Sequence, residues 1–166
     1  MCKMLYPTQE AASSYVIDYD KLYKMGIRGL IYDIDNTLVM HGAPANGEAL
    51  KLFARLKSIG FDTCLISNNK EPRVKPFADA VGSKYIYKAD KPSRKNYIKA
   101  MEMMGTDAES TYFIGDQLFT DICGANRAGI RSILVKPIDP KEEIQIILKR
   151  ILEKPVLFIY HHRRKR

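Results

Sequence analysis

The chain has few cysteines and no long apolar run. Its 166 residues include three cysteines, Cys2, Cys64 and Cys123, none of them in a C-x-x-C pair. This scatter favours neither a disulfide framework nor a zinc site, and it suits a reducing compartment. The longest apolar run near the end, residues 156–160, is far below the ~20 residues that span a bilayer. We expect a cytoplasmic protein that is neither secreted nor membrane-spanning.

Internal repeats, low-complexity tracts and Gly/Ser linkers are also missing, so nothing in the sequence divides the chain. Hydrophobic residues make up 46% and charged residues 28%, which is the usual mixture of a folded globular protein. We expect one domain over residues 1–166, with a core at about 27–137. Residues 1–26 and 138–166 are then appendages to it.

Positive charge exceeds negative charge. The formal net charge is +8, and residues 163–166 form an uninterrupted basic run at the end. Such a run attracts polyanions, either lipid headgroups or nucleic acid. A solvated, frayed terminus is the alternative interpretation.

Short apolar runs alternate with stretches of helical periodicity, which predicts βαβ units around a parallel sheet. The expected strands are residues 29–32, 61–66, 85–87, 111–114 and 130–135. The expected helices cover residues 49–60, 72–80, 92–104 with Pro92 in the first turn, 119–128 and 141–153. The pattern therefore predicts a Rossmann-like α/β domain with helices on both faces of the sheet.

Polar clusters follow the predicted strands, at the sheet edge where ligands of such folds bind. Asp33 and Asp35 are spaced i, i+2, so both carboxylates can face one phosphate. Two unpaired acids repel each other unless a divalent cation neutralises them. Asp116 follows another strand and adds an oxygen ligand, and such hard ligands favour Mg²⁺.

Donors for a phosphate come from two other loops. Ser67 offers a hydroxyl before a helix start, and Lys91 offers a positive charge. Asp121 is expected to brace the site, although capping within its own helix is the alternative. Each residue alone fits ordinary loop chemistry, but the ordered set after successive strands favours one site.

The segments D-I-D-N-T-L, S-N-N, K-P and G-D-x-x-x-x-D resemble, in order, the four signature motifs of haloacid-dehalogenase (HAD) phosphatases. More closely, residues 4–135 resemble the capless subfamily IIIA group called YqeG. That group is related to the phosphatidylglycerophosphate phosphatases of mitochondria and plastids.

The resemblance implies a mechanism. Asp33 would attack phosphorus as the nucleophile, and Asp35 would act as the general acid and base. Mg²⁺ would be held by Asp33, the backbone carbonyl of Asp35, and Asp116. The remaining implied site residues are Ser67, Asn68 and Lys91 for phosphate binding, with Thr37 and Asp121 in support.

Residues 38–67 and 68–91 leave no room for a separate cap domain, which by analogy suggests an open crevice for large or membrane-anchored phosphates. His41, in the loop 40–46, is either a substrate contact or a solvated residue. We favour phosphatidylglycerophosphate as substrate, with peripheral contact between the basic C-terminus and an anionic membrane. The alternatives are a soluble nucleotide or sugar phosphate phosphatase and an RNA- or ribosome-associated binding module. The three clustered acids argue against nucleic acid as a partner.

Overall fold

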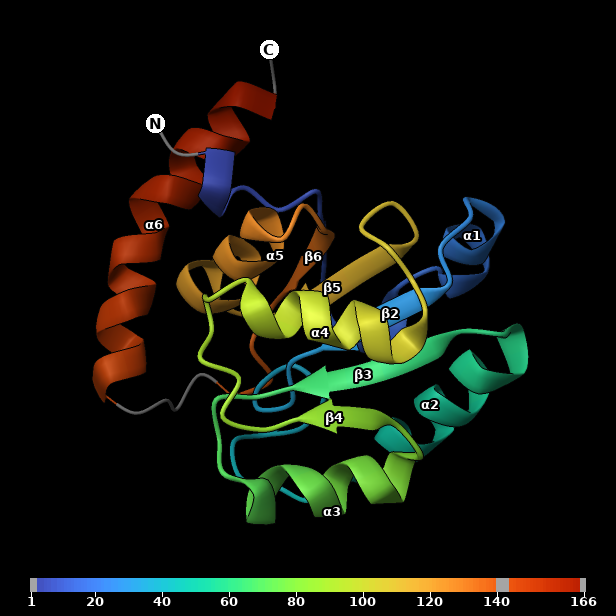
Figure 1. The fold of residues 1–166 in the computed structure, drawn as a ribbon. Helices are drawn as coiled ribbons and strands as arrows, with labels where there is room; N and C mark the ends of the chain where they lie inside the picture. The colour runs from blue at the N-terminus through green and yellow to red at the C-terminus, as the bar shows by residue number, and fades with distance from the viewer. Residues whose placement is uncertain (1–2, 140–143, 165–166) are drawn as a thin grey trace.

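A six-stranded, fully parallel sheet forms the centre of the computed structural model, which describes residues 3–139 and 144–164 (Figure 1). The strand order is β1-β6-β5-β2-β3-β4. The strands are β1 Gln9–Ala11, β2 Gly29–Tyr32, β3 Asp62–Ile66, β4 Lys84–Ile86, β5 Thr111–Gly115 and β6 Arg131–Val135. The predicted α/β class is confirmed, and the five predicted strands lie within a residue or two of their expected bounds.

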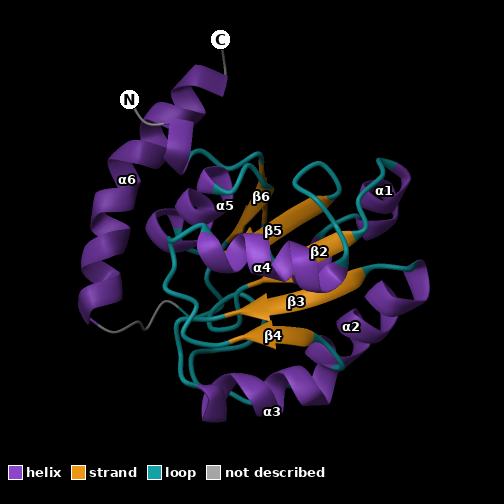
Figure 2. Ribbon diagram, in the orientation of Figure 1, coloured by secondary structure: helices purple, strands orange, loops and turns teal. Residues whose placement is uncertain are grey.

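Helices cover both faces of this sheet (Figure 2). They are α1 Tyr19–Lys24, α2 Gly47–Ile59, α3 Glu71–Val81, α4 Lys95–Met104, the π-helix η3 Leu118–Ile122, α5 Cys123–Arg127 and α6 Ile144–Arg164. Alternate residues of the buried strand β2 serve the two faces, as strand geometry requires. Leu30 packs in a core with Phe53 of α2 and Phe77 of α3, whereas Ile31 packs in a core with Tyr97 of α4.

The segments between the strands are short. One loop and α2 join β2 to β3, and α3 alone joins β3 to β4. The capless arrangement expected from the sequence is therefore confirmed, and the carboxyl ends of the central strands are left uncovered by any inserted domain.

Three helices differ from their predictions, and the one predicted over residues 119–128 is divided into η3 and α5. Helix α4 begins at Lys95, and Pro92 lies in the preceding turn, so the prediction of Pro92 in the first helical turn was wrong. Asp90 adopts a positive φ of 51°, and the Lys91 N–H donates to the Asn68 side chain, so the chain is held as a loop here. Helix α6 continues to Arg164, eleven residues past the expected end, while predicted residues 141–143 lie outside the described part.

The N-terminal segment takes part in the sheet. Strand β1 pairs in parallel with β6, in the register Gln9 with Ile133 and Ala11 with Val135. This strand was not predicted, because Q-E-A lacks the apolar alternation that marks a strand. Within the described residues, no helix is long and apolar enough to cross a bilayer.

Gly124 of α5 lies against the ring of Tyr97, whose hydroxyl donates to the Thr120 carbonyl at 2.9 Å. A Cβ on Gly124 would come within 2.3 Å of that hydroxyl oxygen. We predict that Gly124→Ala lowers the free energy of unfolding by about 1–3 kcal/mol through overpacking. Urea denaturation measures this change.

The matched control is Gly47→Ala, because a Cβ there would meet nothing within 4 Å. Gly47 lies in the first turn of α2, where alanine is expected to stabilise by about 0.4–1 kcal/mol. Equal effects of the two substitutions would contradict the packing argument.

Candidate active site

A crevice of about 170 Å³ opens at the carboxyl ends of the central strands. The loops after β2, β3, β4 and β5 all contribute to its lining, as the strand-end argument predicted. Predicted site residues in this lining are Asp33, Asp35, Ser67, Asn68 and Lys91, and the loop residue His41 lines it as well. Asp116, Asp121 and Thr37 lie beneath them and are buried.

Lys91 joins the loop after β4 to two acids from other loops. Its buried Nζ lies 2.6 Å from Asp33 Oδ1 and 2.7 Å from Asp121 Oδ1. Asn68 fixes the Lys91 backbone, since its side chain accepts from the Lys91 N–H at 2.8 Å and donates to the Lys91 carbonyl at 3.3 Å. The lysine is thus positioned from its main chain as well as through its ammonium.

Three buried carboxylates gather at the floor of the crevice. Asp33, Asp116 and Asp121 each offer an oxygen that lies within 4.8 Å of the others. Asp121 Oδ2 accepts the N–H groups of Asp116 and Gln117, both at 3.1 Å, while its Oδ1 faces Lys91. Both oxygens of Asp121 are therefore engaged by protein donors, as a bracing residue requires.

Gly115 makes room for this brace. A Cβ on Gly115 would lie 2.5 Å from Asp121 Oδ2, so any larger residue would displace the carboxylate. Thr37 approaches from the loop after β2 and donates its hydroxyl to Asp116 Oδ1 at 3.0 Å.

The cluster has more negative than positive charge. Burial raises the pKa of Asp33 well above its usual value, the neighbouring acids raise it further, and Lys91 opposes the rise. Burial and then Asp121 raise the pKa of Asp116 to about 7, against the effect of Arg150. Burial lowers the pKa of Lys91, but Asp121 and Asp33 outweigh it and the pKa is raised. A divalent cation fits such a donor set, because it would favour the ionised carboxylates.

The Asp35 carboxylate is held by three donors that include two unpredicted side chains. Arg73 of α3 donates to Oδ1 at 2.8 Å, as does the Gly42 N–H, and Asn69 donates to Oδ2 at 2.7 Å. Asn69 adjoins the predicted Asn68 in S-N-N, so its position in the sequence could have indicated that it belongs to the site. Arg73 carried no signal beyond its place in the first turn of the next helix.

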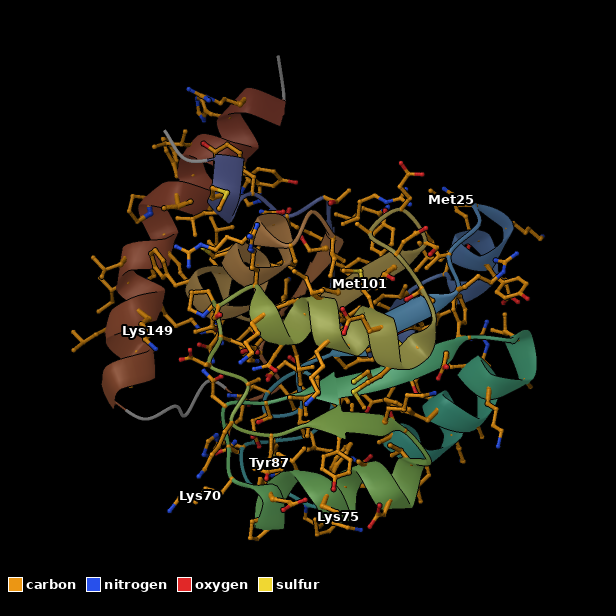
Figure 3. All side chains as sticks on the ribbon, in the orientation of Figure 1. Met25, Lys70, Lys75, Tyr87, Met101 and Lys149 are labelled. Carbon is orange, nitrogen blue, oxygen red and sulfur yellow. The ribbon has the colours of Figure 1, made fainter. Side chains whose placement is uncertain are left out.

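Helix α6 brings two further unpredicted residues to the site. Arg150 donates to both the carbonyl and the carboxylate of Asp116. Its neighbour Lys149, labelled on α6 in Figure 3, lines the crevice itself. Both residues lie some thirty positions beyond the last motif, so only the tertiary structure could have placed them here.

Comparison with known proteins identifies the family of the chain. A family model described as HAD-hydrolase-like matches residues 88–137. The probable phosphatase YqeG of Bacillus subtilis is 35% identical over 156 residues, which cover 93% of this chain and 91% of that protein. The chloroplastic/mitochondrial phosphatidylglycerophosphate phosphatase 1 of Arabidopsis thaliana is 26% identical over 79% of this chain and 40% of that protein.

Solved structures share the fold at lower identity. A subfamily III A HAD hydrolase from Legionella pneumophila aligns with a TM-score of 0.56 and 17% identity, over 73% of this chain and 72% of that one. The YrbI phosphatase of Haemophilus influenzae aligns with a TM-score of 0.55 and 16% identity, over 70% and 81% of the two chains. By its identity to YqeG over nearly the whole chain, together with its fold, the chain belongs to the HAD superfamily as a phosphatase of the YqeG group.

Proposed function

We propose that Asp33 is the nucleophile of a Mg²⁺-dependent phosphomonoesterase. The observation that carries the proposal is the contact of 2.6 Å between Asp33 and the buried Lys91 at the floor of an open crevice. Lys91 holds the attacking carboxylate in place and adds positive charge where the phosphoryl group would lie. Asp33 then attacks phosphorus, the bond to the alcohol oxygen breaks, and an aspartyl-phosphate forms.

Asp35 would give a proton to the departing alcohol oxygen and later take one from the water that cleaves the aspartyl-phosphate. Its orientation by Arg73 and Asn69 supports this role, since a general acid must be held at the leaving group. Ser67 and Lys91 would bind the phosphoryl oxygens. Asn68 would contribute by fixing Lys91, and Thr37 and Asp121 by fixing Asp116.

Mg²⁺ would be held by Asp33, the backbone carbonyl of Asp35, and Asp116. It supplies positive charge that neutralises the phosphoryl oxygens and the clustered acids. The grouping of three buried carboxylates within 4.8 Å supports this site. The Arg150 guanidinium contacts the Asp116 carboxylate, so Arg150 would have to move for Asp116 to bind Mg²⁺.

For the substrate we propose phosphatidylglycerophosphate, met at an anionic membrane. Similarity to the phosphatidylglycerophosphate phosphatases of Arabidopsis thaliana and Chlamydomonas reinhardtii supports this choice. The capless crevice and the net charge of +8 are consistent with a large anionic substrate. A soluble nucleotide or sugar phosphate is the competing substrate, whereas the clustered acids disfavour an RNA-binding function.

Replacement of the nucleophile gives the first test. We predict that Asp33→Asn lowers kcat by about 10⁴-fold or more, because no covalent intermediate can form. The measurement is Mg²⁺-dependent phosphate release from phosphatidylglycerophosphate in mixed micelles and from a panel of soluble monoesters.

Asp79→Asn is the control, since Asp79 is an exposed residue of α3 paired only with Lys75 in the described structure. Hydrolysis of soluble monoesters alone would keep the mechanism and reject the lipid substrate. Full activity of Asp33→Asn would reject the mechanism.

The Arg73 contact gives a second test. Arg73→Gln is expected to lower kcat by about 10- to 100-fold on alkyl phosphates, part of the 10²- to 10⁴-fold that general acid catalysis contributes. The loss should be much smaller on p-nitrophenyl phosphate, whose leaving group departs without a proton. Steady-state kinetics on both substrates measure the difference.

Arg55→Gln serves as the control, because Arg55 forms an exposed ion pair with Asp20 away from the crevice. Equal losses on the two substrates would show that Arg73 acts on the fold or on binding and does not orient the acid.

A further inference from the structure

Helix α6 turns a stripe of apolar side chains toward solvent. Its members are exposed and lie on one side of the helix at helical spacing: Leu148, Ile151, Leu152, Phe158 and Ile159. We call this set the outer face of α6. A helix on a globular protein normally directs such a stripe into the core. Contiguous apolar surface of this kind marks a contact site.

The opposite side of α6 is already committed to the protein. Arg150 contacts Asp116, and the Glu153 carboxylate accepts the Leu118 N–H at 2.8 Å. Near the end of the helix, the Tyr160 ring lies 5.3 Å from that of Tyr6. Rolling the helix to bury its outer face would break all of these contacts. Nothing in the described part of the chain therefore covers the outer face.

Cations border the outer face along its length. Lys149, Lys154 and Arg163 are exposed, and no carboxylate among the described residues pairs with any of them. An apolar face edged by Lys and Arg is the pattern of a helix that lies in the plane of a lipid interface. No helix in the described part of the chain is long and apolar enough to cross a bilayer.

We propose that the outer face of α6 inserts into the headgroup region of an anionic lipid bilayer, with Lys149, Lys154 and Arg163 against lipid phosphates. A second copy of this chain fits the same face less well. Pairing two outer faces would bring the bordering cations of both copies together, in a protein of net charge +8.

Membrane contact at this face has a consequence for the crevice. Lys149 borders the outer face and also lines the crevice that contains Asp33. Figure 3 shows Lys149 on the end of α6 nearest the carboxyl ends of β3 and β4. A bilayer on the outer face would therefore adjoin the crevice mouth, so that a phosphomonoester lipid reaches Asp33 without leaving the membrane. The access of a lipid to Asp33 rests on the proposed function, whereas the membrane contact of α6 does not.

The test is binding to sedimentable vesicles of phosphatidylcholine, with or without phosphatidylglycerol, at an ionic strength of about 0.1 M. The variant is Leu148→Glu/Leu152→Glu, which places two charges on the outer face. Its matched control is Val16→Glu/Met25→Glu. Val16 and Met25 are 66% and 48% exposed, against 57% and 62% for Leu148 and Leu152, and the added charge is the same.

Wild type and the control pair are expected to bind the phosphatidylglycerol vesicles, and more weakly those of phosphatidylcholine. The outer-face variant should lose about tenfold or more in partition coefficient, because two leucines no longer leave water. An unchanged urea midpoint for both variants shows that each remains folded.

Equal binding by the two double variants, or no vesicle binding by wild type, overturns the proposal. So does a dimer in solution that Leu148→Glu/Leu152→Glu dissolves, because the face would then belong to a second copy. Hydrolysis is scored separately on phosphatidylglycerophosphate in detergent micelles. Loss of vesicle binding with hydrolysis intact rejects the surface alone, whereas binding without hydrolysis rejects the substrate and leaves the surface standing.

Discussion

The buried ammonium of Lys91, shared between Asp33 and Asp121, is the interaction on which the rest of the crevice depends. It joins the loops after β2, β4 and β5. Burial there disfavours the charged forms of both Lys91 and Asp33. Removing one partner of such a buried pair typically costs about 3–5 kcal/mol, because the other charge is left uncompensated. Asp121 also accepts the Asp116 N–H, so the acids that we propose hold Mg²⁺ and the lysine that we propose binds phosphate are positioned as one unit.

Much of the fold could be predicted because its signals are local. Five strands are short apolar runs bounded by polar loops, and parallel strands place the motifs at one sheet edge. Asp33, Lys91 and Asp116 therefore came together as expected. Strand β1 could not be predicted, since three polar or small residues become a strand only by pairing with β6. The prediction for Pro92 was wrong because the hydrogen bond between Lys91 and Asn68 holds this segment as a loop, and α4 begins only at Lys95.

The site residues that were not predicted reach the site through tertiary contacts. Asn68 was expected at the phosphate and does line the crevice, where its side chain also bonds to the Lys91 backbone. That Asn69 reaches Asp35 was not expected. Arg150 could not be inferred at all, because nothing local to α6 indicates a partner in a loop after β5. The two sides of α6 differ in chemistry. The inward side places Arg150 against the acidic cluster, and the outward side exposes apolar side chains to solvent.

Pairing between the two ends of the chain also sets the order of assembly during synthesis. Gln9 leaves the ribosome early but pairs beside Ile133, and Asp116 waits for the guanidinium of Arg150. Until β6 has been made, β1 has no strand to pair with and β5 is an open sheet edge, and the Asp116 carboxylate lacks its arginine until α6 follows. Unpaired edges are the surfaces through which chains aggregate, so the β5 edge is most exposed to aggregation before β6 and β1 have paired beside it.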